Sequence, residues 1–292
     1  MKSGFVSIIG RPNAGKSTLL NALSGEKLAV VSNKPQTTRN TITGIYTDSE
    51  KQIVFLDTPG LHKPKTKLGE FMMKEAETAI SSVDVVLLVV EQGHSFDNEA
   101  IIEDIKNIGV PVILVINKID ICEKENILSM IAKYSGMMDF AEIIPISAKN
   151  KDGVALVMDA ITERLEDGPM YFPDDMITDQ PEKQIAAEIV REKALWCLDK
   201  EVPHGIAVEI SSFKESDNGV LEIGATIYCE KSSHKGIIIG KGGEMLKKIG
   251  SLARKDMERF FDQKVFLELW VKVKEGWRDS DFMLRNFGYE QK

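Results

Sequence analysis

Residues 10 to 17 read Gly-Arg-Pro-Asn-Ala-Gly-Lys-Ser, which matches the spacing G-x-x-x-x-G-K-[ST] of a phosphate-binding loop. An apolar strand-like run, Phe5–Ile9, precedes the loop, and a helical pattern, Lys16–Leu23, follows it. Backbone N–H groups and the positive end of the helix dipole would then both point at a bound anion. An ordinary glycine-rich turn is the alternative, but the complete motif in this context favours phosphate binding. The predicted nucleotide contacts here are Asn13, Ala14, Gly15, Lys16, Ser17 and Thr18.

Two of these residues and two later ones predict a magnesium and γ-phosphate site. Lys16 is placed to reach the β- and γ-phosphates, and Ser17 is placed to ligate Mg²⁺. Asp57, in the run Asp-Thr-Pro-Gly, ends a strand pattern and is placed to hold Mg²⁺ through water. The N–H of Gly60, at the end of the same run, is placed to meet the γ-phosphate.

The polar segment 35–39 lies between these motifs and is predicted to respond to the nucleotide. One of its threonines should bind Mg²⁺ and the γ-phosphate, and we favour Thr38 over Thr37. Loss of the γ-phosphate would release the segment, and a solvated polar loop is the alternative interpretation. The predicted metal ligands are therefore Ser17, Thr38 and Asp57.

One position argues for slow hydrolysis. Leu61 stands where Ras-like proteins carry a glutamine that orients water, and leucine cannot hydrogen-bond water. The combination of Asn13 with this leucine resembles the pattern of GTPases that recruit a monovalent cation beside the phosphates. We therefore hypothesise that GTP hydrolysis depends on potassium. The predicted catalytic residues are Lys16, Thr38, Gly60 and Asn13.

A second pair of loops is predicted to select the base. Asp120, in the run Asn-Lys-Ile-Asp, follows a strand pattern, and its carboxylate can accept from the ring N–H and the amino group of guanine. Adenine lacks both donors, and an unpaired buried carboxylate is costly, so discrimination should be large. Asn117 would brace the loops and the Lys118 stem would lie along the base, whereas an ordinary polar turn is the alternative. The backbone N–H groups predicted to reach guanine O6 are those of Ser147, Ala148 and Lys149. The expected ligands are GTP or GDP with Mg²⁺.

Another glycine loop, Gly-Lys-Gly-Gly at residues 240–243, lies between an isoleucine run and an apolar helical pattern. This arrangement resembles a KH domain, whose G-x-x-G loop clamps about four nucleotides of a single strand. Residues 231–259 hold eight Lys/Arg against three Asp/Glu, which fits an electrostatic footprint for nucleic acid. A helix N-terminus with a solvated basic face is the alternative. The predicted RNA contacts are Gly236, Ile237, Ile238, Ile239, Gly240, Lys241, Gly242, Gly243, Lys247 and Lys248.

These residues need a particular set of elements to position them. Strand runs alternate with helical patterns over residues 1–169, which predicts an α/β P-loop GTPase domain with a doubly wound, mostly parallel sheet. A β-rich run at Thr41–Tyr46 could pair antiparallel at the sheet edge. Residues 170–181 indicate a linker, and residues 182–292 an α+β domain in the type II KH order. The strands expected in the first domain are Phe5–Ile9, Ile53–Leu56, Val85–Val90, Val112–Ile116 and Ile143–Ile146. Its expected helices are Lys16–Leu23, Leu68–Ser81, Asn98–Ile108, Glu123–Tyr134 and Gly153–Leu165. The second domain should contain a helix at Glu182–Glu201, strands at Gly205–Phe213 and Leu221–Glu230, a loop and helix at Gly240–Phe260, and a strand at Val265–Val273.

Composition limits the classes of function. The chain has 292 residues, 43% hydrophobic residues and a net charge of −8, which is typical of a globular protein. Three scattered cysteines and four histidines without ligand spacing indicate neither a disulfide framework nor a zinc site. The N-terminus fits no signal peptide and the run Val85–Val90 is too short to span a bilayer, so we expect a cytoplasmic protein. Peripheral membrane association is the weakest alternative, because the acidic chain shows no basic amphipathic helix.

Together these motifs resemble the Era family of bacterial ribosome-associated GTPases over essentially the whole chain. The resemblance rests on the nucleotide motifs, on the single KH-type loop behind them and on the closing run Leu269–Arg278. It implies that the KH domain binds the 3′ end of 16S rRNA and the 30S subunit. It also implies that GTP acts as a switch during small-subunit maturation, and we expect a monomer. A GTP-loaded RNA adaptor in which hydrolysis is incidental is the alternative.

Overall fold

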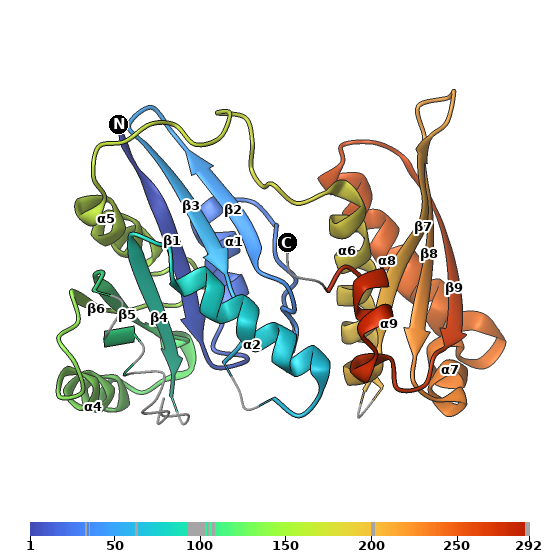
Figure 1. Ribbon diagram of the computed structural model, residues 1–292, viewed down its shortest axis with the longest axis horizontal. Coiled ribbons are helices and arrows are strands. Elements are labelled where there is room, and N and C mark those ends of the chain that lie inside the picture. Colours follow the sequence, from blue (N-terminus) through green and yellow to red (C-terminus); the bar gives the residue numbers. More distant parts are fainter. Residues whose placement is uncertain are drawn as a thin grey trace. The chain divides into compact units, whose positions relative to one another are not determined.

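The computed structural model describes residues 1–32, 34, 36–61, 64–92, 103, 105–106, 109–199 and 202–289 (Figure 1). Contacts divide the chain into two units, and the chain passes between them five times. The first unit comprises Met1–Ala29, Thr38–Lys63 and Met72–Asp179, and the second comprises Val30–Thr37, Pro64–Phe71 and Gln180–Lys292. Two short segments of the N-terminal half therefore fold with the C-terminal unit.

A six-stranded sheet forms the centre of the first unit, in the order β2-β3-β1-β4-β5-β6. Every neighbouring pair is parallel except β2 with β3, so the predicted antiparallel edge is confirmed. Parallel strands place their carboxyl ends on one edge, which is where ligands bind in such sheets. The strands are β1 (Lys2–Gly10), β2 (Ile42–Thr47), β3 (Lys51–Asp57), β4 (Val85–Glu91), β5 (Val112–Asn117) and β6 (Glu142–Pro145).

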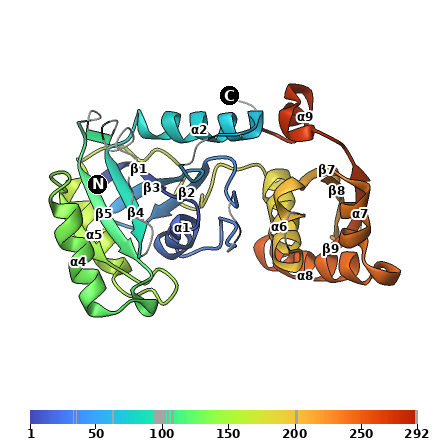
Figure 2. The same cartoon turned by 90° about the horizontal axis from the view of Figure 1, so that it is seen from below.

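Helices cover both faces of this sheet, and Figure 2 shows α1 and α2 on opposite sides of it. Side chains alternate along β4, so Leu87 packs in the core with α1 and α5. Val86 and Leu88 pack in the other core, with α2 and α4. The helix predicted at Asn98–Ile108 lies largely outside the described residues. The helices are α1 (Lys16–Ser24), α2 (Lys67–Ile80), α4 (Lys124–Ser135) and α5 (Val154–Arg164).

A three-stranded sheet in the order β7-β8-β9 forms the centre of the second unit. The strands β7 and β8 are antiparallel, and β8 and β9 are parallel, which confirms the predicted KH strand order. Helices α6 and α8 share one apolar core with this sheet. The elements are α6 (Glu182–Cys197), β7 (Ala207–Glu215), β8 (Leu221–Cys229), α7 (Ser232–Ile239), α8 (Glu244–Phe260), β9 (Val265–Val273) and α9 (Asp281–Asn286).

Helix α7 is not predicted from the sequence. Gly236 and three consecutive isoleucines are poor helix formers, so the local sequence does not indicate a helix here. Ile238, however, is fully buried in the core of the second unit. Packing of this side chain therefore overrides local propensity immediately before the glycine loop.

Residues 170–181, predicted to be a linker, contain no helix or strand. The segment nevertheless folds with the first unit as far as Asp179. The fully buried Gln52 side chain holds it: Oε1 accepts from the N–H groups of Tyr171 (2.7 Å) and Phe172 (3.0 Å). Its Nε2 donates to the Phe172 carbonyl oxygen at 2.8 Å. Most of the segment is therefore a strap bound to β3, not a free tether.

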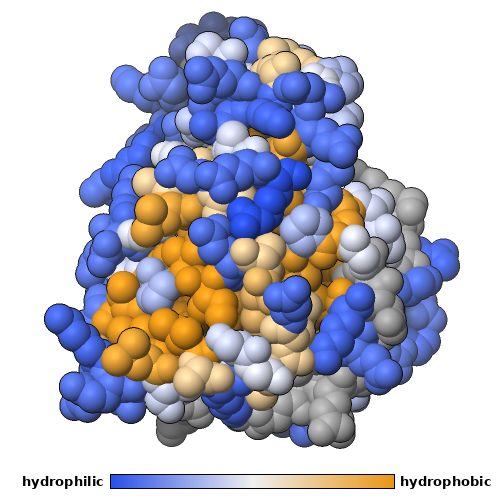
Figure 3. Space-filling view, turned by 90° about the vertical axis from the view of Figure 1, so that its left-hand side faces the viewer, coloured by the Kyte–Doolittle hydropathy of each residue, from blue (hydrophilic) through white to orange (hydrophobic). Residues whose placement is uncertain are grey.

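Apolar side chains also reach the surface of the first unit on the side that carries α4 and α5, which Figure 3 faces. The exposed fraction is 75% for Ile121, 66% for Leu128 and 61% for Leu156. Within the described part of the chain, no helix has the length and apolar content needed to cross a membrane.

Candidate nucleotide site and nucleic-acid interface

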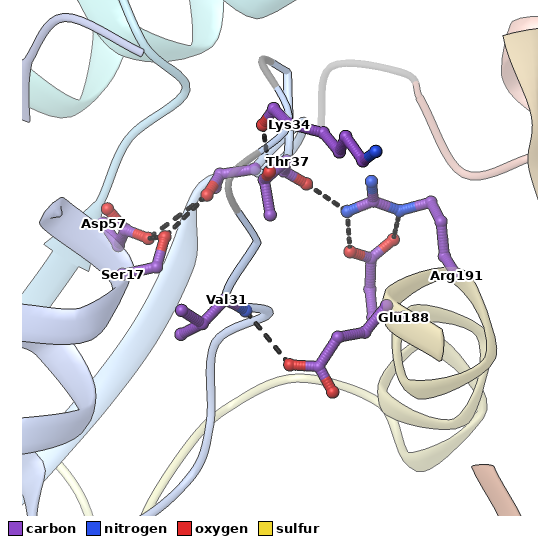
Figure 4. Close-up of polar contacts among 9 residues, drawn as sticks. Ser17, Val31, Lys34, Thr37, Asp57, Glu188 and Arg191 are labelled. Carbon is purple, nitrogen blue, oxygen red and sulfur yellow. Dashed lines mark hydrogen bonds and ion pairs between the residues drawn. The ribbon is translucent and has the colours of Figure 1, made fainter. Parts of the chain in front are cut away.

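Three side-chain oxygens converge at the carboxyl edge of the larger sheet (Figure 4). Ser17 Oγ lies 2.6 Å from Asp57 Oδ2 and 2.8 Å from Thr38 Oγ1, and Thr38 Oγ1 lies 3.4 Å from Asp57 Oδ2. Asp57 is fully buried, and its Oδ1 has no hydrogen-bond partner among the described residues. Two hydroxyls and a carboxylate with an unsatisfied buried oxygen fit Mg²⁺, which binds oxygen ligands.

Burial sets the charge of two groups at this site. It raises the pKa of Asp57 to about 6, although Lys16 and the Ser17 hydroxyl favour the ionised carboxylate. It lowers the pKa of Lys16 to about 8, against the attraction of Asp57. The buried Lys16 ammonium donates to the carbonyl oxygens of Gly10 and Arg11, each at 3.1 Å. A phosphate anion beside Lys16 and a divalent cation beside Asp57 would favour the ionised forms of both.

Two glycines allow the loops to approach one another. Gly15 has a φ of +97°, and a Cβ there would lie 2.1 Å from Asn117 Nδ2. A Cβ on Gly60 would lie 2.6 Å from the backbone nitrogen of Pro12. A side chain at either position would therefore push apart groups that form the phosphate end of the site.

Asn117 ties the phosphate loop to the loop after β6. Its Nδ2 donates to the Ala14 carbonyl oxygen at 2.9 Å, and its Oδ1 accepts from the Ala148 N–H at 3.0 Å. The hydrogen bonds expected of a brace are therefore present. Lys149 follows as an exposed residue, and Thr18 is half-buried in the first turn of α1.

Asp120 lies at the same end of the site, where its Oδ1 accepts from the Ser147 hydroxyl at 2.7 Å. The residue is exposed, so the burial assumed in the discrimination argument is absent here. A base hydrogen-bonded through its edge to Asp120 would have to supply that burial. Lys118 adopts a φ of +68° and forms an ion pair with Glu91. Sequence reasoning missed Glu91, and only its register beside Asn117 across β4 and β5 could have indicated it.

Three further positions bear on hydrolysis: Leu61, the threonine pair 37–38 and Asn13. Leu61 is 6% exposed, packs in the core with α2 and α4, and presents no polar group to water. Thr37 turns its hydroxyl to the Lys34 carbonyl oxygen at 2.6 Å, so Thr38 is the threonine that faces Ser17 and Asp57. Asn13 is exposed, with a φ of +65°.

The second glycine loop joins α7 to α8. Gly240, Gly242 and Gly243 have φ values of +75°, +61° and +83°, which favour glycine. No side chain caps the start of α8, and the Glu244 N–H there donates to the Lys241 carbonyl oxygen. Gly236 is exposed on α7. The exposed lysines on this part of the unit are Lys241, Lys247 and Lys248.

A groove of about 380 Å³ lies beside this loop, between α8 and β9. Its apolar lining comes from Leu246, Leu267 and Leu269, and not from Ile237, Ile238 or Ile239, which the sequence predicts as RNA contacts. Ile238 is fully buried in the core, Ile237 is 51% exposed, and Ile239 is partly buried. Alternation along β9 is the signal that could have placed its two leucines on one face. The other lining residues are Gly243, Lys247, Gly250, Ser251 and Arg254.

Comparison with known proteins identifies both domains. Residues 5–118 match the family model of the 50S ribosome-binding GTPase, and residues 201–278 match that of the KH domain. GTPase Era of Ruminiclostridium cellulolyticum is 57% identical over 291 residues, covering 99% of this chain and 98% of the relative. GTPase Era of Clostridioides difficile is 52% identical over 295 residues, covering 100% and 99%.

Solved structures agree over the full length. A variant of Aquifex aeolicus Era bound to GDP and AlF4− is 42% identical, with a TM-score of 0.96 and complete coverage of both chains. A crystal structure of Era in complex with MgGDPNP and nucleotides 1506–1542 of 16S ribosomal RNA is also 42% identical and fully covered, with a TM-score of 0.95.

Proposed function

The chain belongs to the Era family of GTPases, and on this premise we propose that GTP controls how its KH domain holds the 3′ end of 16S rRNA. As a member of that family, it binds GTP and hydrolyses it to GDP and phosphate. The observation that carries the proposal is the position of Thr38, whose hydroxyl meets Ser17 and Asp57. A threonine that binds Mg²⁺ only beside a γ-phosphate makes the preceding segment sensitive to hydrolysis.

The phosphate end of the site works through charge and position. Ser17, Thr38 and Asp57 would hold Mg²⁺, which when bound neutralises charge that develops on the phosphates. Lys16 and the loop N–H groups bind and orient the β- and γ-phosphates. The Gly60 N–H donates to the γ-phosphate and so links the loop after β3 to the nucleotide state. The remaining contacts, Asn117, Lys118, Asp120 and the 147–149 loop, read the guanine.

The site lacks a polar side chain at position 61 to orient the attacking water. Leu61 cannot orient a water, so intrinsic hydrolysis should be slow. A potassium ion beside Asn13 would add a positive charge next to the phosphates. Rates of GTP hydrolysis measured in potassium and in sodium buffers test this part, with Asn13→Ala as the matched variant. Equal rates in the two salts would remove potassium from the proposal.

The RNA end of the proposal combines the glycine loop with the groove beside it. The loop N–H groups and exposed lysines bind phosphates, and the apolar lining between α8 and β9 accepts bases. This division fits a single strand because bases and backbone are then held by different surfaces.

The test is binding of a labelled single-stranded RNA matching the 3′ end of 16S rRNA, with GTP analogue, GDP or no nucleotide. Affinity should be highest with the GTP analogue and should fall at least tenfold in Gly242→Asp. Gly219→Asp is the matched control, because Gly219 also has a positive φ and open space but lies in the turn after β7. Affinity that ignores the nucleotide would overturn the switch.

The alternative is an RNA adaptor in which hydrolysis is incidental, and the buried Leu61 favours it. A Lys16→Ala protein separates the two functions, because it should lose nucleotide binding while its groove is intact. Full RNA binding and full cellular function in this variant would support the adaptor.

The proposal also covers partners and location. We propose that the chain binds the 30S subunit and acts in small-subunit maturation in the cytoplasm. It would work as a monomer, with domains at residues 1–169 and 182–292. Co-sedimentation with 30S subunits and light scattering test partner and state. Co-sedimentation with anionic vesicles at physiological salt tests the membrane alternative, for which the apolar surface in Figure 3 is one candidate contact.

A further inference from the structure

Helix α6 buries three consecutive charged residues, Arg191, Glu192 and Lys193, each at most 2% exposed. Removing charge from water is costly, and apolar side chains usually stabilise a core as well as a buried ion pair does. The stability of the second unit alone therefore does not explain why these three residues are charged. Their hydrogen-bond and ion-pair partners indicate what else they do.

One partner, Val31, lies at the start of the segment Val30–Thr37, which folds with the second unit. Glu192 Oε1 accepts from the Val31 N–H at 3.1 Å. Trp196 Nε1 donates to the Val31 carbonyl oxygen at 2.7 Å. Both backbone groups of one residue are therefore held by side chains of α6.

The end of the same segment is held as well (Figure 4). Arg191 donates to the Thr37 carbonyl oxygen, and Glu188 orients its guanidinium by accepting from Nε at 2.8 Å. Thr37 directly precedes Thr38 in the chain. Helix α6 thus fixes both ends of the segment that leads into the proposed Mg²⁺ ligand.

The chain of charges continues from this segment to α8. Lys193 Nζ lies 2.6 Å from Glu192 Oε2 and 2.5 Å from Asp256 Oδ2 of α8. The same ammonium lies 4.0 Å from the ring of Trp196. Asp256 follows Arg254, which lines the groove, by two residues. One polar path therefore runs from the groove helix to the backbone of Val31.

We infer that the path Asp256–Lys193–Glu192–Val31 couples RNA in the groove to the nucleotide-sensitive segment; this rests on the proposed function. RNA that fixes α8 holds Asp256, which keeps Lys193 against Glu192 and so keeps Glu192 bonded to Val31. With its start and end fixed, the segment presents Thr38 to Ser17 and Asp57.

The test is the ratio of RNA affinities with GTP analogue and with GDP, measured on the full chain. The double variant Glu192→Gln/Lys193→Met removes both charges at similar volume and keeps an acceptor for the Val31 N–H. Its ratio should fall to within about twofold of one, while nucleotide affinity changes less than about threefold. The control Glu230→Gln/Arg278→Met removes an ion pair of the same unit, 2.6 Å long, that touches neither α6 nor the segment. It should keep the wild-type ratio.

A wild-type ratio in the double variant would overturn the path alone, whereas a ratio of one in the wild type would overturn the proposed switch together with the path. If the double variant does not fold, the wild-type protein still decides. In chain labelled with 5-fluorotryptophan, the ¹⁹F signal lost in Trp196→Phe should shift when GDP is exchanged for GTP analogue and again when RNA is added. An unmoved Trp196 signal would overturn the path.

Discussion

Lys16 and Asp57 are buried ionisable side chains whose pKa values are shifted toward the neutral forms. Each ionised group therefore costs stability at neutral pH, and bound phosphate or Mg²⁺ offsets that cost. This trade between stability and function is common at binding sites. The charges proposed to bind the nucleotide are therefore charges that burial disfavours in the folded chain.

Replacing Lys16 by methionine should abolish nucleotide binding yet stabilise the nucleotide-free protein at pH 7 by about 1–2 kcal/mol. In the fold the pKa of Lys16 is about 8, below its ordinary value of 10.5. The unfolded chain therefore binds the extra proton, so the cost is full below pH 8 and fades toward pH 10.5. Urea unfolding at pH 7 and pH 10 measures the free energy of unfolding of the wild type and of Lys16→Met. The difference in favour of the variant should be smaller at pH 10. Equal stability of the two proteins at pH 7 would contradict the argument.

Asp120 should decide which base is bound. Asparagine at this position offers one acceptor and one donor, which matches xanthine and mismatches guanine. Asp120→Asn should therefore weaken GTP binding by about 100-fold and strengthen XTP binding. Competition between the two nucleotides measures the change. Asp159→Asn, at an exposed residue of α5, is the control and should leave both affinities unchanged.

At the scale of elements, motif residues could be predicted because each lies within a few positions of its strand end. The apolar strands indicated the parallel sheet, and its edge then collects Ser17, Asp57 and Asn117. Residues that act across the sheet could not be predicted in this way. Glu91 reaches Lys118 through strand register, and Gln52 reaches a strap more than a hundred positions away. Helix α7 forms through core packing that its glycine and isoleucines do not signal.

The groove between α8 and β9 makes a prediction at the same scale. Gly250 lines the groove, and a Cβ there would lie 3.2 Å from Leu269 Cδ1, the end of a side chain that can shift. Gly250→Leu should fill the groove and lower RNA affinity at least about tenfold. Leucine is the better helix former, so the melting temperature should not fall. Unchanged RNA affinity with an unchanged melting temperature would show that bases do not enter this groove.

At the scale of the whole molecule, the chain passes between its two units five times. The two excursions into the second unit are Val30–Thr37, which precedes Thr38, and Pro64–Phe71, which follows Gly60. Both therefore adjoin residues predicted to sense the γ-phosphate. The start of α2 is tied to the C-terminal region as well, since Lys67 Nζ lies 2.6 Å from Asp281 Oδ2. The segments proposed to sense the nucleotide thus belong to the folding unit that carries the groove between α8 and β9.

This division predicts reciprocal binding. If the GTP analogue raises RNA affinity by some factor, RNA must raise affinity for the GTP analogue by the same factor, because both follow from one coupling free energy. We expect a factor of about 5 to 150, which corresponds to the usual range of such couplings. Affinity for GDP should respond far less, since GDP offers no γ-phosphate to Thr38 and Gly60. Fluorescent nucleotide titrations with and without RNA measure the factor, and Gly242→Asp should bring it to one. Unequal factors for the two directions would mean that RNA also binds outside the groove, at a place the nucleotide does not control.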